Sequence, residues 1–77
     1  MTTLHRYRNW KIQVFGREHG IPHFHLWTPK QTAVIAIETL EVLSGGVDST
    51  VLKEAKAWAN GHRAELSREW SRLNPEK

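Results

Sequence analysis

Residues 10–27 read WKIQVFGREHGIPHFHLW and contain two strand patterns joined by a loop with two glycines and a proline. Apolar and polar side chains alternate over residues 10–15, which is typical of a half-buried β-strand. Residues 23–27 predict a second strand, in which Phe24 and Leu26 point to one face and the remaining three side chains to the other. This pair of strands predicts an antiparallel hairpin joined by a polar turn that Gly16 and Gly20 bracket.

The hairpin extends along the chain into a small sheet. Residues 32–37 are β-branched and apolar on both sides, which predicts a third strand covered on both faces. Because the loops are short, we expect a three-stranded antiparallel meander preceded by an N-terminal arm, residues 1–9. Residues 38–46 allow either a last short strand or an irregular crossover, and Gly45-Gly46 breaks the chain after them.

The C-terminal third, residues 47–73, has the periodicity of a helix. Asp48 or Ser49 can cap its start. Its apolar or bulky positions follow steps of three and four: Val51, Ala55, Trp58, His62, Leu66, Trp70 and Leu73. Asn60-Gly61 interrupts this pattern, so either one long helix kinks there or two helices meet there. Because the phase is unbroken on both sides, we favour one long, kinked helix. The predicted fold class is therefore α+β, with a three-stranded antiparallel meander packed against a long C-terminal α-helix in a single domain, residues 1–77.

Composition excludes several classes of protein. The 77 residues include no cysteine, so disulfides and thiolate zinc sites are excluded and a cytoplasmic location is expected. No apolar run approaches the roughly 18 residues that span a bilayer, so no membrane association is expected. The net charge is +3 and the basic residues gather near the N-terminus, which suits RNA, DNA or an acidic protein as a partner. An exposed edge strand at this small size also favours a homodimer.

Three of the five histidines lie in the connection and in the strand after it. His19, His23 and His25 follow Glu18 with the spacing H-x3-H-x-H. Imidazoles gathered beside a carboxylate suit metal ligation, so the three histidines are candidate ligands for zinc or another divalent transition metal. Glu18 would be a fourth ligand or would orient one of the rings.

The same cluster allows two other interpretations. His19, His23, His25 and Glu18 could perform metal-free acid–base catalysis, most simply RNA cleavage, with Arg17 or Lys30 holding the phosphate. Alternatively, the surface only binds a protein or a nucleic acid, with Trp27 as an anchor. The enzyme would be a ribonuclease or a metal-dependent hydrolase, and the binding module would perform no reaction.

Other polar residues have a structural interpretation. His62 lies on the apolar stripe of the predicted helix and is expected to be a core or kink residue. Glu38 and Glu41 could form a paired carboxylate site, but a solvated turn is the simpler expectation.

The chain is similar to the DUF4160 family of small bacterial and phage-associated proteins. The matching stretches are Glu18-His19, Pro22-His23-Phe24-His25, Val34 to Gly45, Trp58-Ala59, His62-Arg63, Glu65-Leu66 and Trp70. Ile21 and Asp48 depart from the family pattern at positions where proline is common. The resemblance implies a setting in two-gene toxin–antitoxin-type modules, in which this chain would be the toxin-like half and would have a small cognate protein partner.

Overall fold

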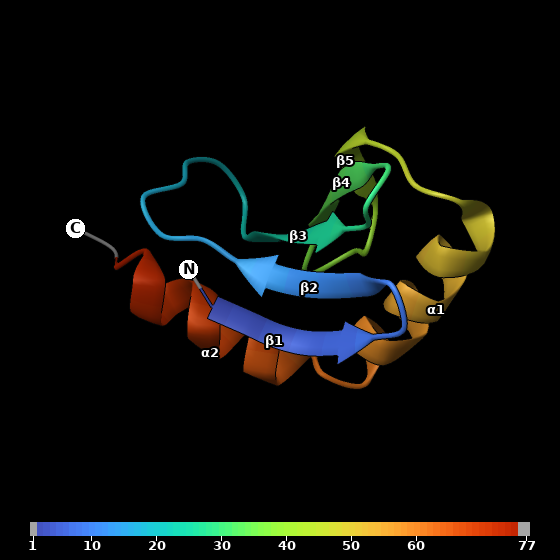
Figure 1. The fold of residues 1–77 in the computed structure, drawn as a ribbon. Coiled ribbons are helices and arrows are strands. Elements are labelled where there is room, and N and C mark those ends of the chain that lie inside the picture. Colours follow the sequence, from blue (N-terminus) through green and yellow to red (C-terminus); the bar gives the residue numbers. More distant parts are fainter. Residues whose placement is uncertain (1, 76–77) are drawn as a thin grey trace.

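A five-stranded antiparallel sheet and two helices make up the computed structural model, which describes residues 2–75 (Figure 1). The strand order in the sheet follows the chain order, β1-β2-β3-β4-β5. The strands are β1 (Thr2–Tyr7), β2 (Trp10–Val14), β3 (His23–Trp27), β4 (Thr32–Ala36) and β5 (Val42–Gly45). The helices are α1 (Ser49–Asn60) and α2 (Arg63–Leu73).

The predicted three-stranded meander was wrong, because the sheet has a further strand at each edge. Strand β1 occupies most of the expected N-terminal arm and pairs with β2 across a tight turn at Arg8 and Asn9. Its side chains are mostly polar and none is fully buried, so it lacks the apolar alternation by which a strand is predicted. Strand β5 is fully exposed and pairs with β4, so residues 42–45 form the short last strand rather than a crossover.

The predicted single long helix was also wrong, because the chain leaves the helical path at Gly61 and His62. The N–H groups of these two residues bond three residues back, to Trp58 and Ala59, instead of four. In addition, Nδ1 of His62 lies 2.7 Å from the Trp58 carbonyl oxygen and donates to it. The Trp58 carbonyl, which would accept the His62 N–H in a continuous helix, instead accepts the Gly61 N–H and the His62 side chain. The first helix therefore ends here, and α2 begins at Arg63.

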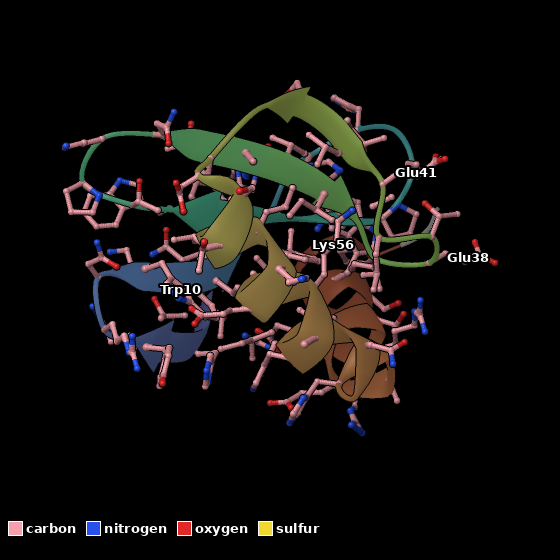
Figure 2. The ribbon with its side chains drawn as sticks, turned by 90° about the vertical axis from the view of Figure 1, so that its right-hand side faces the viewer. Trp10, Glu38, Glu41 and Lys56 are labelled. Carbon is pink, nitrogen blue, oxygen red and sulfur yellow. The ribbon has the colours of Figure 1, made fainter. Side chains whose placement is uncertain are left out.

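The hydrophobic core lies between one face of the sheet and the two helices. Its largest side chains with no exposed surface are Phe24, Ile12, Leu26, Ile35, Ile37, Leu66 and Val14. The strongly twisted sheet arches over α1, and both helices lie on this side of it (Figure 2). The opposite face of the sheet carries no helix over most of its area. At one end the connection between β2 and β3 covers it, and His23, which projects from this face, packs on Trp70 of α2.

Polar contacts fix both ends of the helical layer. Asp48 caps α1 as predicted, since its carboxylate accepts the N–H of Thr50 at 3.0 Å. At the other end, Glu69 of α2 accepts the hydroxyl of Thr2 at 2.6 Å and forms an ion pair with Arg72. The first strand is therefore attached to the last helix.

Candidate functional site

The connection between β2 and β3 is shaped by its backbone and held by α2. Arg17 has a φ of 60° and Gly20 a φ of 91°, so the chain reverses twice within a few residues. Asn74, which follows α2, accepts the N–H of Glu18 at 2.8 Å and donates to the carbonyl of Phe15 at 2.9 Å. Both ends of one amide side chain thus hold the connection against the helix.

Three side chains converge at the base of this connection. Oε1 of Glu18 lies 2.8 Å from Nε2 of His23 and 2.8 Å from Nε2 of His25. The three atoms lie within 4.8 Å of one another. His23 and His25 project together because they are two residues apart in β3, and the turn brings Glu18 over them.

The surroundings of both rings restrict how they can move. Nδ1 of His23 lies 2.8 Å from the Ile21 carbonyl, and the ring packs 4.7 Å from Trp70 of α2. The His25 ring stacks on Phe15 at 4.4 Å. The exposed fraction is 11% for the His23 side chain and 25% for that of His25, so the cluster is shielded but reachable from solvent.

Glu18 stays ionised in this setting. Burial tends to raise its pKa, but the hydrogen bonds from His25 and His23, together with their charges, lower the pKa of Glu18 below its ordinary value of 4.5. A carboxylate held in the charged form beside two imidazoles can bind a cation or accept a proton.

His19 and Arg17 lie beside the cluster rather than in it. Both side chains are exposed and line a cleft of about 440 Å³, together with Glu18 and the end of α2. Among residues 2–75, the group with converging ligand atoms contains Glu18 and two histidines, and His19 is not one of them. The structure therefore brings together three of the four residues of the predicted cluster.

The other predicted site residues lie farther from the cluster. Trp27 is 40% exposed at the end of β3, and Lys30 lines a separate cavity in the next turn. Glu38 and Glu41 are exposed at the connection between β4 and β5 (Figure 2), and neither belongs to the converging group. They therefore match the expected solvated turn.

The remaining histidines pack on one tryptophan. The rings of His5 and His62 stack on Trp58 at 4.6 and 4.1 Å. His62 also bonds the end of α1, as described above, so it has the structural role that its position on the stripe predicts.

Sequence reasoning missed Asn74, Phe15 and the Ile21 carbonyl as supports of the cluster. Asn74 is 56 residues away from Glu18, and no local pattern signals such a contact. The sequence signal at this position is the dipeptide Asn74-Pro75, which predicts the end of a helix and no contact with Glu18.

Residues 9–71 match the family DUF4160, described as a domain of unknown function. This match spans most of the chain, so the protein belongs to that family. No curated protein and no solved structure matches the chain. None of the helices within residues 2–75 is both long enough and apolar enough to cross a membrane.

Proposed function

We propose that this DUF4160 protein binds a divalent transition-metal ion through Glu18, His23 and His25. The observation that carries the proposal is the convergence of one carboxylate oxygen and two imidazole nitrogens on one point. Two histidines and one carboxylate form a familiar ligand set for catalytic zinc and for non-haem iron. Bonds of about 2.1 Å in a tetrahedral site place ligand atoms about 3.4 Å apart, so an entering ion needs the 2.8 Å pairs to open by roughly 0.6 Å.

The hydrogen bond on the far side of His23 supports this assignment. A carbonyl oxygen only accepts, so Nδ1 of His23 carries the proton that it donates to Ile21. In the protonated ring Nε2 donates to Glu18, and when the ring loses that proton Nε2 has a lone pair aimed at the carboxylate, which is itself an acceptor. A cation between these atoms satisfies both of them. A ligating histidine that donates its other N–H to a backbone carbonyl is also the usual arrangement around protein-bound metals.

Three protein ligands leave a fourth position of a tetrahedral ion to water or substrate, which is typical of catalytic rather than structural zinc sites. Glu18 also lines the neighbouring cleft, in which the exposed Arg17 and His19 would contact an anionic group. The reaction class that fits is metal-dependent hydrolysis of an anionic substrate. The role as toxin-like half of a two-gene module stays a prediction from the family resemblance, and the metal site does not depend on it.

Native mass spectrometry of protein stripped of metal and then titrated with zinc tests the proposal. We expect one zinc ion per chain for the native protein. Glu18→Gln, which keeps the side-chain shape, and His25→Gln, which removes the imidazole, should each weaken binding strongly, because each removes one of the three ligands. His19→Gln removes an exposed histidine next to the site and is the matched control, which should bind as the native protein does.

Two results would contradict the proposal. One is the absence of a zinc-bound species at any concentration that leaves the fold intact. The other is an equal loss of binding in His19→Gln and His25→Gln. Loss of ribonuclease activity on His25→Gln in metal-free protein would instead support the acid–base alternative.

A further inference from the structure

The helix-free face of the sheet carries an ordered set of side chains. Strand register places one cross-strand row over β1 to β4, and the paired residues are Arg6, Lys11, Trp27 and Thr32. The neighbouring row runs over all five strands and contains Thr3, Gln13, His25, Val34 and Ser44. Neither row contains an aspartate or a glutamate. This face thus combines positive charge with an aromatic ring and has no carboxylate among these nine positions.

Trp27 and Lys11 form the centre of the first row. Nζ of Lys11 lies 4.6 Å from the centroid of the Trp27 ring, and 40% of Trp27 is exposed. Both residues line a small hollow of about 140 Å³, which Arg6 and Arg8 border as well. Within residues 2–75, the structure records no ion pair for any of these three cations, so their charge is available to a ligand.

We propose that this face binds single-stranded nucleic acid, with an unpaired base stacked on Trp27 and backbone phosphates held by Lys11 and Arg6. Open sheet faces that combine a basic row with an exposed aromatic ring suit single strands, because an unpaired base offers its π-face to the ring. A duplex hides those faces and would use only the charges. The charge on the face complements a phosphate backbone rather than a basic partner.

The proposed surface and the metal cluster share β3 but are independent. His25 is two residues before Trp27 and projects from the same face, so the two lie roughly 7 Å apart along the strand. A strand bound across Trp27 would therefore extend towards His25. Binding itself uses none of the three metal ligands, so it can be measured with chelator present, and it can succeed or fail regardless of the metal site.

The experiment is fluorescence anisotropy of labelled oligouridylate and oligothymidylate, each about 12 nucleotides long, within the range that one small binding domain covers. The full chain is titrated in chelator at about 50 and about 200 mM salt. We expect binding of at least one of the two single strands, weakened by salt. A preference for the RNA or the DNA oligonucleotide identifies which nucleic acid the face is built for.

Two pairs of variants test the roles of the ring and the charge. Trp27→Ala should weaken binding by about 5- to 150-fold, whereas Trp27→Phe, which keeps an aromatic face, should lose much less. Lys11→Gln should lower the slope of log K against log salt by about 0.7. Lys53→Gln removes the same charge from an exposed position on α1 and should change neither affinity nor slope.

Three results would overturn the proposal. The first is no binding of either single strand at the lower salt concentration. The second is binding of a duplex of equal length as tight as that of the single strand. The third is unchanged affinity in Trp27→Ala, with circular dichroism confirming that the variant is folded. Competition by poly-glutamate as effective as that of the oligonucleotide would also overturn it and assign the face to an acidic protein.

Discussion

Asn74 holds Glu18 in place from outside the ligand cluster. Its Oδ1 accepts the Glu18 N–H at 2.8 Å, and its Nδ2 donates to the Phe15 carbonyl at 2.9 Å. The carboxylate can meet both imidazoles only while this turn keeps its shape. A residue that follows the last helix therefore positions the acidic ligand of the proposed metal site.

Asn74→Ala should weaken zinc binding by about 10- to 100-fold, as is typical when a group that supports a ligand is removed. All three ligands remain in the variant, so the loss would come from the groups that the Asn74 side chain holds, which are the turn at Glu18 and the Trp70 carbonyl at the end of α2. Isothermal titration calorimetry with zinc measures the effect. Asn9→Ala, at an exposed asparagine in the turn between β1 and β2, is the control and should bind normally. Equal zinc affinities of Asn74→Ala and the native protein would show that Asn74 does not position Glu18 for metal binding.

Zinc should raise the thermal stability of the native protein. A ligand at about 100 times its dissociation constant stabilises the folded state by about 2.7 kcal/mol, which corresponds to roughly 10–20 °C in Tm for a domain of this size. Differential scanning calorimetry with and without zinc gives the shift. His19→Gln should show the full shift and His25→Gln almost none. A shift that persists in His25→Gln would mean that zinc binds elsewhere on the chain.

Acid should weaken the attachment of β1 to α2. The hydrogen bonds from Arg72 and Thr2 lower the pKa of Glu69 below its ordinary value of 4.5. Because the folded pKa is the lower one, the ionised carboxylate stabilises the fold above about pH 4.5, and this contribution is lost as pH falls through the folded pKa. Urea unfolding should show native protein more stable than Glu69→Gln at neutral pH, with the difference shrinking below pH 4.5.

Glu38→Gln is the control for this acid dependence. It removes the same charge at an exposed turn where the structure shows no ion pair within residues 2–75, so it should change the free energy of unfolding by less than about 0.5 kcal/mol at neutral pH. A difference between native protein and Glu69→Gln that stays constant over the whole pH range would contradict the assigned role of the carboxylate.

Gly45 and Gly46 should respond differently to the same substitution. Gly45 has a φ of 74°, and a Cβ there would clash with the carbonyl oxygen of Thr32 on β4. Gly45→Ala should therefore cost about 1–3 kcal/mol in the free energy of unfolding. A Cβ on Gly46 meets no atom within 4 Å, so Gly46→Ala should stay within about 0.5 kcal/mol. Urea unfolding of both variants decides, and equal losses would contradict the proposed clash.

The strands that carry the site could be predicted because their side chains alternate locally. Residues 10–14, 23–27 and 32–36 form strands as predicted, and the two-residue spacing of His23 and His25 put their rings on one face. Strand β1 was not predictable in this way, since pairing with β2 rather than an apolar pattern makes it a strand. The helix break was missed because Ala55, Trp58, Leu66 and Trp70 keep the same helical spacing on both sides of it. Such spacing carries no information on the direction of the helix axis.

The composition of the cluster could be predicted only in part. Spacing along the chain suggested three histidine ligands beside Glu18. The turn brings Glu18, and not His19, next to His23 and His25. That choice depends on backbone reversals at Arg17 and Gly20 and on a contact with residue 74, which no short-range pattern contains. Lys11 was also missed as a partner of Trp27, because their pairing follows from cross-strand register.

The attachment of early segments to the last helix has a consequence for the order of folding. The hydrogen-bond partner of Glu18 lies 56 residues later in the sequence, and that of Thr2 lies 67 residues later. Contacts so distant in sequence form late, because closing long loops costs entropy before any bond compensates for it. During synthesis on the ribosome, the two histidines and the glutamate emerge well before the asparagine that holds them. The three ligands are not held together before Asn74 has been synthesised, so a growing chain should acquire its metal affinity only after that residue has left the ribosome.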